Sequence, residues 1–582
     1  MKVCDFIVSY LAKNAGLSHL FTYAGGTNAM LLNSAARHPG IKVVPMRHEE
    51  NAALAADGFS RIKRGHGFAL SMSGPGATNM ITGIAQAYYD SSPVLFLTGN
   101  VTTSTYKYDL PLRQLGFQES DIISMVKPIT KGAYFVDQAG RLPKVLKIAL
   151  NDCVSHRQGP VLIDIPFDTQ RQELTQDQST MTFDKIQTNY FLTDDEFKEF
   201  IKLLQGAKRP VILAGGGIQS SNTAGKLADF AHQLNLPVLH TLMGKDAFPN
   251  EDSLYVGFIG SYGNRDANRI LAVSDLVIAL GCRLSSRHTA KLDEFKANKK
   301  IIHIDIDQNM LGSTVEPDLG INIDLRNFFS FFREKCSQAN IKYSAPEDWL
   351  KIIKKIQALL SGDTEEDKGD LNPKKFLKKL VQSQSTYQET IYTVDVGGHQ
   401  MWSLQCLKLR KQDRILLSGG LGTMGYAIPA AIGAHFAASE SNLVTICGDG
   451  GFQMSLPELQ TLIEFNIPLK LIVINNSMLG LMKNFQDENF GGLHTATVIG
   501  YSVPDISKVA SSFGLSSKCI GKDNEVDDAL LWLNNAKRPA LLEVKTPMEW
   551  GPYPKVLPGS GLTKQYPPLS DDIEQKIREI LS

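Results

Sequence analysis

Short runs of apolar residues recur along the chain and alternate with stretches of helical pattern. The clearest runs, each ending in a glycine or a polar turn, are FALSMSG, PVLFLTGN, GPVLIDIP, RPVILAGGG, DLVIALGCR, KKIIHIDID, NLVTICGDG and PLKLIVINN. A run that is apolar on both faces is typical of a buried parallel strand, and the helical stretches between such runs supply the crossover connections. The pattern therefore predicts an α/β fold built from doubly wound parallel sheets.

Two polar segments interrupt this alternation. Residues 168–189 (DTQRQELTQDQSTMTFDKIQTN) lack periodicity, and residues 361–375 (SGDTEEDKGDLNPKK) are charged and contain glycine and proline. Both compositions are typical of linkers. The two segments predict three domains and a C-terminal tail, over residues 1–170, 190–345, 370–555 and 556–582.

Composition limits the class of protein. At 582 residues the chain is too long for a single hydrophobic core. Its 60 basic and 60 acidic residues balance, so no net charge attracts it to nucleic acid or to an anionic membrane. The seven cysteines show no CxxC spacing, which argues against a disulfide framework or a zinc site and for a reducing compartment. The N-terminus (MKVCDFIVSYLAKNAG) has the pattern of an amphipathic helix rather than a signal peptide, and no apolar stretch is long enough to span a bilayer. We expect a cytoplasmic protein without a nucleic-acid or membrane partner.

The strongest local signal lies in the third predicted domain. There a Gly-Asp-Gly turn ends one predicted strand and begins a helix, where exposed backbone amides form a natural phosphate cradle. Asp449 in this turn offers a carboxylate, and the next strand delivers Asn476 to the same sheet edge. Oxygen ligands of this kind, completed by diphosphate oxygens, suit Mg²⁺. Either piece alone is also an ordinary turn, but together they predict a diphosphate–Mg²⁺ site.

Motifs elsewhere in the chain extend this signal. In order they are RHEENAALAADGFSR, SGPGATN, GFQESDI, GHQMW, LSGGLGTMGYAIPAAIGA and GDGGFQMS followed by NNSMLG. With these motifs the chain resembles the acetohydroxyacid synthase (acetolactate synthase) family, whose members use thiamine diphosphate (ThDP). The resemblance implies three doubly wound parallel-sheet domains: pyrimidine-binding, middle and diphosphate-binding. It also implies a homodimer or homotetramer that binds small-molecule substrates at an active site between two subunits.

The resemblance assigns residues to the ThDP site. Glu49 matches the glutamate that hydrogen-bonds the aminopyrimidine ring, and Met424 matches the bulky residue that bends the cofactor. The backbone carbonyl of Met478 is implied as a third protein ligand of Mg²⁺, beside Asp449 and Asn476. Other positions match the cofactor-contacting loops, namely Val396, Gly397, Gly398, His399, Gly422, Gly450 and Gly451. Positions that match the reaction centre are Gly25, Gly26, Phe117 and Gln118.

Two adjacent acids open the helix that contains the first motif. Without the family motif, Glu49 would be an ordinary acid favoured by the helix dipole in a first turn. Helical spacing places Glu49 on a face with Ala52, Ala53 and Ala56, small residues that leave room for another surface. Glu50 lies instead on a more polar side. We expect Glu49 to be buried at the cofactor and Glu50 to be a solvated or weakly paired neighbour.

The middle domain matches segments that hold FAD in acetohydroxyacid synthases, where FAD has a structural, non-redox role. The matching positions are Gly215, Gly216, Leu242, Gly260, Gly281, Arg283, Asp305 and Asp324. Glycine turns let a backbone approach a pyrophosphate, although a lone Gly-Gly-Gly is weak support. Tyr262 replaces the family's usual histidine, and Ser285 and Ser286 replace an acidic pair, whereas Arg287 is retained to reach both flavin and substrate.

The departures from the family pattern cluster at the second substrate. Phe167 replaces the usual lysine, Phe485 replaces the usual tryptophan, and the loop after LTGN is longer and lacks a Pro-Arg-Arg run. A 2-keto acid acceptor carries a carboxylate, so lost cations weaken the case for it unless Arg113 or Lys107 compensates.

These changes favour one branch of the family as the main interpretation. Its members decarboxylate pyruvate and transfer the two-carbon unit to the ketone of a nucleotide-linked deoxysugar. The alternatives are an acetolactate synthase that joins two 2-keto acids, an FAD-dependent pyruvate oxidase, a simple decarboxylase and a non-enzymatic nucleotide-binding protein.

Overall fold

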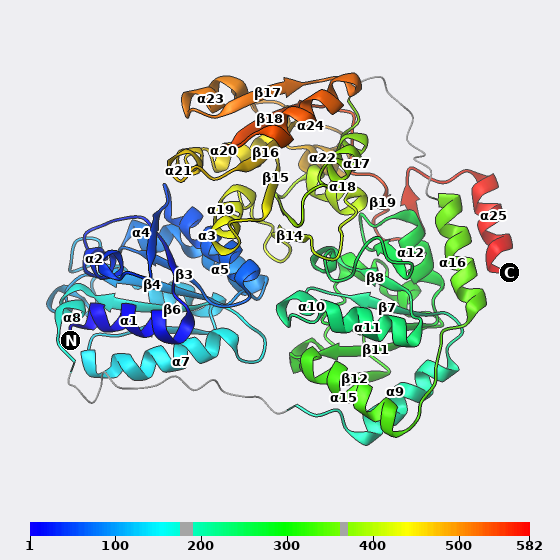
Figure 1. The fold of residues 1–582 in the computed structure, drawn as a ribbon, viewed down its shortest axis with the longest axis horizontal. Helices are drawn as coiled ribbons and strands as arrows, with labels where there is room; N and C mark the ends of the chain where they lie inside the picture. Colours follow the sequence, from blue (N-terminus) through cyan, green and yellow to red (C-terminus); the bar gives the residue numbers. More distant parts are fainter. Residues whose placement is uncertain (175–189, 361–370) are drawn as a thin grey trace.

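Three six-stranded parallel sheets, each flanked by helices, form the framework of the computed structural model, which describes residues 1–174, 190–360 and 371–582 (Figure 1). Each apolar run picked out in the sequence forms a strand, and the predicted α/β class is confirmed. These strands are buried along almost their whole length because helices cover both faces of each sheet.

The first and third sheets share one relative strand order. The first sheet has the order β2-β1-β3-β4-β6-β5 and the third has β14-β13-β15-β16-β18-β17. The strands of the first are β1 (His19–Thr22), β2 (Lys42–Pro45), β3 (Gly67–Ser71), β4 (Val94–Asn100), β5 (Gly132–Phe135) and β6 (Val161–Pro166). Those of the third are β13 (Thr390–Val394), β14 (Arg414–Leu417), β15 (Asn442–Gly448), β16 (Leu469–Asn475), β17 (Ser516–Ile520) and β18 (Ala540–Lys545).

The middle sheet has a different order, β12-β11-β10-β7-β8-β9, which is that of a dinucleotide-binding fold. Its strands are β7 (Pro210–Ala214), β8 (Val238–His240), β9 (Tyr255–Phe258), β10 (Leu276–Leu280), β11 (Lys300–Asp305) and β12 (Leu319–Asn322). In such sheets ligands bind at the carboxyl ends of the strands, where the order reverses. Here the reversal falls between β7 and β10.

Helices connect the strands of each sheet. In the first domain they are α1 (Val3–Ala15), α2 (Ala29–Arg37), α3 (Glu49–Lys63), α4 (Pro75–Asn79), α5 (Ile81–Tyr89), α6 (Ile122–Val126), α7 (Leu142–Val154) and α8 (Phe167–Arg171). The middle part contains α9 (Asp194–Gly206), α10 (Gly217–Ser220), α11 (Ala224–Leu234), α12 (Arg265–Val273), α13 (Ser286–Thr289), α14 (Leu292–Lys296), α15 (Leu325–Gln338) and α16 (Glu347–Leu360). The third contains α17 (Pro373–Ser383), α18 (Gly398–Cys406), α19 (Ala427–Ala437), α20 (Asp449–Met454), α21 (Glu458–Glu464), α22 (Gly480–Phe490), α23 (Ile506–Ser512) and α24 (Val526–Asn535). No helix within the described ranges is both long and apolar enough to cross a membrane.

The two predicted linkers lie largely outside the described residues, and their described ends correct the prediction. Residues 168–171 belong to helix α8, because Thr169 and Gln170 are buried and Gln170 Nε2 donates to the carbonyls of Thr27 and Ile165. At the other linker, Asn372 caps helix α17 by accepting hydrogen bonds from the amides of Lys374 and Lys375. The polar composition of these residues led to the prediction of linkers at the end of α8 and the start of α17.

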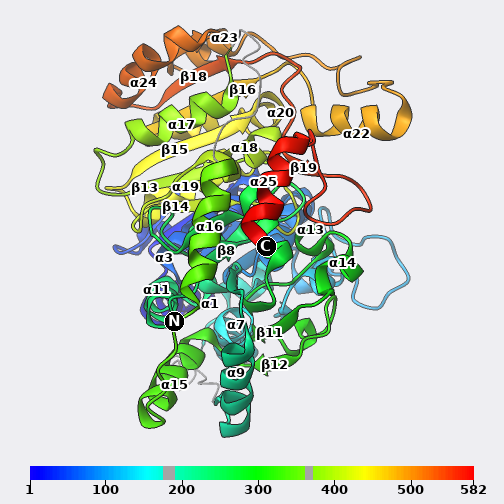
Figure 2. The ribbon, with the colours of Figure 1, turned by 90° about the vertical axis from the view of Figure 1, so that its right-hand side faces the viewer.

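The C-terminal tail folds back onto the middle domain. It forms an antiparallel pair, β19 (Lys555–Val556) and β20 (Gln565–Tyr566), and then α25 (Asp571–Leu581). Helix α25 lies beside α16 at the edge of the molecule (Figures 1 and 2). Arg269 Nη2 forms an ion pair with Glu574 at 2.6 Å, and Arg209 Nη2 donates to the Leu581 carbonyl.

The first and third domains meet along helices α3 and α19, which lie side by side near the centre of the molecule (Figure 1). A Cβ at Gly58 would lie 2.7 Å from Ala430 Cα, and a Cβ at Gly433 would overlap the Ala55 carbonyl oxygen. Only glycine permits so close an approach of two backbones. Buried residues of both domains therefore form one continuous apolar cluster, whereas the middle sheet has clusters of its own.

Candidate functional site

Glu49 lies at the start of α3, directly after the capping residue His48. Its side chain is 7% exposed, and its Oε2 accepts a hydrogen bond from Asn79 Nδ2 at 3.0 Å. A Cβ built on Gly76 would lie 3.2 Å from Glu49 Oε1, so the carboxylate packs against the start of α4, directly after the loop that follows β3.

The same loop gathers two other predicted residues. A Cβ at Gly25 would overlap the side chain of Met72, and a Cβ at Gly74 would lie 3.0 Å from Gln118 Cβ. Gln118 adopts φ +64°, a left-handed conformation that is costly for a residue with a side chain. Residues Met72–Gly76 thus bring Gly25, Glu49 and Gln118 together, and we call this set the pyrimidine half-site. Gly26 is exposed beside it, as is Phe117, at 86%.

A buried acid supports the backbone behind Gln118. Asp164 on β6 accepts hydrogen bonds from Thr98 Oγ1 at 2.7 Å and from Asn100 Nδ2 at 2.6 Å, and Asn100 Nδ2 also donates to the Ser120 carbonyl. Burial raises the pKa of the Asp164 carboxyl to about 7. Asp164 therefore connects the sheet to the segment that carries Gln118.

This raised pKa predicts a pH dependence of stability that Asp164→Asn removes. The folded chain retains a proton that the unfolded chain releases above about pH 4, so the contribution is complete below pH 4 and is lost as the pH rises towards 7. The contribution is at most about 4 kcal/mol. We expect the urea midpoint of the variant to fall less between pH 4.5 and 7.5 than that of the unmodified chain. Equal pH slopes would contradict the assignment.

Asp449 and Asn476 lie at the ends of two adjacent parallel strands, β15 and β16. Asp449 Oδ1 accepts from the Gly450 amide at 2.8 Å and from Tyr501 Oη at 3.0 Å. Its Oδ2 is buried and has no hydrogen-bond partner among the described residues, and burial raises the pKa of this carboxyl to about 6. An orphaned buried oxygen beside an amide oxygen fits a cation, since buried polar atoms are otherwise satisfied.

Met424, Gly450 and the segment after Asn476 also meet here. A Cβ at Gly450 would lie 3.1 Å from Met424 Cε and 2.9 Å from Leu479 Cδ2. The Met478 amide donates to Asn476 Oδ1 at 3.3 Å, which folds the 476–478 turn over the end of β16. Gly451, next along α20, packs against Asp395. We call this set, together with Asp449, the diphosphate half-site.

Asp395 organises this half-site and was missed in the sequence. Its Oδ1 accepts from the amides of Val396 and Gly425, and its Oδ2 accepts from the Ala427 amide at 3.0 Å. It thereby fixes both the loop containing Met424 and Gly422 and the loop Val396–Gly398. The only signal was an acid that ends the apolar strand TIYTV.

The ring of His399 packs against the Val396–Gly398 loop. A Cβ at Gly397 would lie 2.5 Å from its ring, and a Cβ at Gly448 would lie 3.0 Å from it. Burial lowers the pKa of His399 to about 4, so the ring is neutral at pH 7, and its Nε2 has no partner among the described residues. The Val396–Gly398 loop therefore packs on the uncharged imidazole of His399, at the edge of the third sheet.

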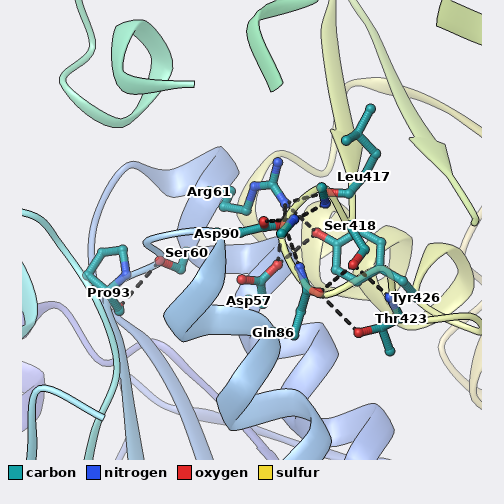
Figure 3. Close-up of polar contacts among 12 residues, drawn as sticks. Asp57, Ser60, Arg61, Gln86, Asp90, Pro93, Leu417, Ser418, Thr423 and Tyr426 are labelled. Carbon is teal, nitrogen blue, oxygen red and sulfur yellow. Dashed lines mark hydrogen bonds and ion pairs between the residues drawn. The ribbon is translucent and has the colours of Figure 1, made fainter. Parts of the chain in front are cut away.

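A buried polar network holds the Met424 loop against the first domain (Figure 3). Arg61 Nη1 on α3 donates to the Leu417 carbonyl and to Tyr426 Oη, both at 2.9 Å. Tyr426 Oη in turn donates to Asp57 Oδ2 at 2.7 Å. Asp57 and Arg61 belong to the side of α3 that carries Glu50. That side is therefore an interface between domains, and Glu50 is half-buried there rather than fully solvated.

The network continues through α5. Gln86 Oε1 accepts from Ser418 Oγ at 2.6 Å and from Thr423 Oγ1 at 3.1 Å, while its Nε2 donates to Asp90 Oδ2 (Figure 3). Asp90 Oδ1 accepts from the Gly420 amide at 2.7 Å. Side chains of the first domain thus fix the turn that leads into Met424.

A cavity of about 590 Å³ lies where the three domains meet. Of the predicted flavin positions it is lined by Gly216, Leu242, Gly281, Arg283, Asp305 and Asp324, together with Arg287. Gly215 lies beside the lining, where a Cβ would overlap the Gly281 carbonyl, and Gly260 approaches the Arg287 carbonyl in the same way. The first domain adds cations that the sequence did not point to, among them Arg64 and Arg157. Glycine-lined turns among several arginines fit a dinucleotide with a pyrophosphate.

The predicted acceptor residues are more dispersed. Phe485 on α22 is 48% exposed and contacts Phe490, while Arg113 is exposed in the loop between β4 and α6. Phe167 begins α8, and the guanidinium of Arg171 lies 4.8 Å from its ring centroid. Arg171 places a cation beside the position where the family's lysine is lost. Its i+4 spacing from Phe167 was the signal that could have revealed it.

Three family models match the chain in order. They describe the N-terminal TPP binding domain of thiamine pyrophosphate enzymes (residues 1–125), their central domain (197–331) and their C-terminal TPP binding domain (395–544). Fold and matches together define a thiamine pyrophosphate enzyme, thiamine pyrophosphate being another name for ThDP.

Curated relatives narrow the class. A protein of Methanocaldococcus jannaschii named "Probable acetolactate synthase large subunit" is 36% identical, with 100% of this chain and 97% of the relative covered. A relative of the same name from Methanococcus aeolicus is 35% identical over 90% of this chain and 88% of its own length. The "Acetolactate synthase large subunit" of Buchnera aphidicola subsp. Schizaphis graminum is 33% identical over 89% and 90%. The chain therefore belongs to the acetolactate synthase family of ThDP enzymes, and the resemblance found in the sequence is confirmed.

Proposed function

We propose that this protein is a ThDP- and Mg²⁺-dependent acetolactate synthase, which decarboxylates pyruvate and transfers the two-carbon unit to a second 2-keto acid. This was the alternative in the sequence interpretation. The observation that carries it is the similarity to acetolactate synthase large subunits along the whole chain. The names of these relatives favour the alternative over the nucleotide-linked keto-sugar acceptor.

The two half-sites give the chain's residues their proposed roles. Bound ThDP supplies the electron sink for decarboxylation. Glu49 accepts and returns a proton at a nitrogen of the aminopyrimidine ring, and Asn79 orients its carboxylate. Met424 would support the bound cofactor, and Asp449, Asn476 and the Met478 carbonyl would hold Mg²⁺, which would neutralise the charge of the diphosphate.

The remaining proposed roles concern the cavity and the acceptor. Arg283, Asp305 and the glycine turns hold FAD, whose role is structural, and Arg287 reaches from it towards the substrate. Gln118 positions the substrate from the pyrimidine half-site.

The active site is proposed to form between two copies of the chain. The exposed rings of Phe117 and Phe485 support this, because large exposed apolar side chains beside a site mark surfaces that a partner covers. A homodimer is the smallest assembly that meets the proposal.

One incubation tests the proposed function. The purified chain is supplied with pyruvate, ThDP, Mg²⁺ and FAD, alone and with a panel of acceptors, and products are identified by mass spectrometry. CO₂ release with acetolactate as product supports it. Acetyl phosphate or acetate with reduced flavin would instead identify a pyruvate oxidase, acetaldehyde a simple decarboxylase, and no CO₂ a non-catalytic protein.

A second candidate acceptor, the nucleotide-linked keto-deoxysugar, is supported by the apolar residues Phe167 and Phe485 and by the long loop after β4. The ketone of a deoxysugar has no adjacent carboxylate, so this acceptor does not need a cation at the positions of Phe167 and Phe485. It predicts that the nucleotide-linked sugar outcompetes 2-keto acids when both are present, and that a branched sugar forms.

Phe485→Trp tests the acceptor subsite. Indole adds area and an N–H donor where the family has tryptophan, so we expect selectivity for 2-keto acids over keto-sugars to rise by roughly 5- to 10-fold. Competition between the two acceptors, followed by product ratios, measures the change. Phe191→Trp, at another exposed ring in the middle part of the chain, is the control and should leave the ratio unaltered. A ratio that is the same for Phe485→Trp and its control would contradict the subsite.

A further inference from the structure

Residues 101–118, between β4 and α6, form a long loop with little regular structure, a single 3-10 turn at Thr103–Thr105. Four large apolar side chains of this loop are exposed: Leu110, Leu112, Leu115 and Phe117. The loop has almost no apolar core of its own. The ring of Tyr106 stacks on Phe135, with 4.5 Å between the ring centroids, and holds the first arm of the loop. The conformation of the outer part of the loop, after Tyr108, must come from polar contacts.

Glu119 supplies those contacts from inside the loop. The residue is only 7% exposed. Its Oε1 accepts from the Lys107 amide at 2.7 Å, and its Oε2 accepts from the amides of Leu115 at 2.6 Å and Gly116 at 3.1 Å. Its backbone carbonyl accepts from Gln114 Nε2 at 3.0 Å. One carboxylate thus ties together both arms of the loop.

The three hydrogen bonds that backbone amides donate to the Glu119 carboxylate are stronger than hydrogen bonds between neutral groups. Hydrogen bonds to an ionised carboxylate are about twice as strong as neutral ones, and a buried acceptor that lost its donors would be costly. The two arms of the loop also lie close together, because a Cβ at Gly116 would lie 2.7 Å from the Thr105 carbonyl oxygen. Glu119 therefore selects one conformation of residues 107–116.

The base of the loop is held independently of Glu119. Asp168 accepts from the Thr103 amide at 2.9 Å and from Thr103 Oγ1 at 2.6 Å. On the other side Ser120 Oγ accepts from the Gly74 amide, and the Ser120 carbonyl accepts from Asn100. Gln118 is thus fixed to the pyrimidine half-site even when the outer loop is free to move.

We propose that Glu119 is a positioning residue that holds residues 107–116 as a fixed wall of the acceptor subsite. The inference rests on the proposed function and deepens it, because the loop carries Arg113, its base is bound to Asp168 beside Phe167, and it ends at Gln118. A fixed wall binds the second substrate without ordering a loop first, which lowers the cost of binding. Decarboxylation of the first substrate does not need the wall.

Glu119→Gln tests the proposal, since glutamine keeps the size but replaces one acceptor oxygen with an NH₂ group that faces backbone donors. We expect the KM for the acceptor to rise at least about 10-fold, while CO₂ release in a single turnover of pyruvate, which needs no acceptor, changes less than about 2-fold. Trypsin should cut after Lys107 and Arg113 at least about 10-fold faster. Asp109→Asn makes the same charge change at an exposed position of this loop and should alter neither quantity.

Several outcomes would overturn the role of Glu119. Unchanged acceptor KM and unchanged trypsin cleavage would do so, as would an equal loss in CO₂ release and acceptor transfer. Leu115→Pro removes one of the same amide donors and should reproduce the Glu119→Gln profile; a normal profile for it counts against the clamp. If the unmodified chain releases no CO₂ from pyruvate, the proposed function fails instead, and trypsin cleavage still decides whether Glu119 fixes the loop.

Discussion

Glu49→Gln is expected to lower the rate of CO₂ release from pyruvate by about 10²- to 10⁴-fold, the range for loss of a group that transfers a proton. Glutamine cannot exchange a proton with the aminopyrimidine ring. It retains an oxygen for Asn79 Nδ2, so the start of α3 should stay intact and the thermal midpoint should move little. Single-turnover CO₂ release with saturating ThDP separates this effect from weaker cofactor binding.

Glu50→Gln is the matched control for this change. The two acids are adjacent in one helix turn, but consecutive residues point to different sides of a helix, and Glu50 is half-buried on the side that carries Asp57 and Arg61. We expect it to keep at least about half of the activity. Activity of Glu49→Gln within a few-fold of the unmodified chain would remove Glu49 from the mechanism and with it the pyrimidine half-site.

Gly433→Ala is expected to destabilise the chain by about 3 kcal/mol or more, the upper range for overpacking a buried site. Its Cβ would overlap the Ala55 carbonyl oxygen and lie 2.7 Å from the Phe59 nitrogen, and both are backbone atoms that no rotamer change can move. Helices α3 and α19 must therefore separate. Because α19 follows the Met424 loop, ThDP affinity should fall together with the urea midpoint.

Gly225→Ala is the matched control for stability. Gly225 is exposed in α11, and no atom outside its neighbourhood lies within 4 Å of an added Cβ. Alanine is the better helix former, so we expect a neutral or stabilising change of about 0.5 kcal/mol. If Gly433→Ala is as harmless as this control, the two helices are not in backbone contact in solution.

The strands that the sequence predicted are those with apolar residues on both faces. Among the strands that the sequence runs did not include, β2, β5 and β17 lie at sheet edges and expose residues on at least one face, whereas β13 and β18 are buried inside the third sheet and were also missed. The pattern of the edge strands is mixed, and mixed patterns over four or five residues do not differ from those of loops. The domain boundaries stay predictions, since the linkers that define them fall mostly outside the described residues.

The site was predictable where its chemistry is local. Asp449 and Asn476 follow consecutive strands, so a sheet places them together whatever the rest of the chain does. Asp395, Gln86 and Asp90 act through contacts with residues far away in sequence, and no spacing rule reveals such pairs. The roles of the family-matched residues, from Gly25 to Phe485, remain predictions. The structure gives the position of each of these residues but does not test its role.

The backbone contact between α3 and α19 has a consequence for biosynthesis. Helix α3 is translated early, yet the surface that covers its glycine and alanine face is Ala427–Ala437, which leaves the ribosome only after the whole middle part of the chain. At about 5–20 residues per second this interval lasts tens of seconds. During it the first domain is incomplete, and its bare helix is a site for chaperone binding or for pairing with a neighbouring nascent chain. The order of synthesis therefore leaves this face of the first domain uncovered until α19 has been made.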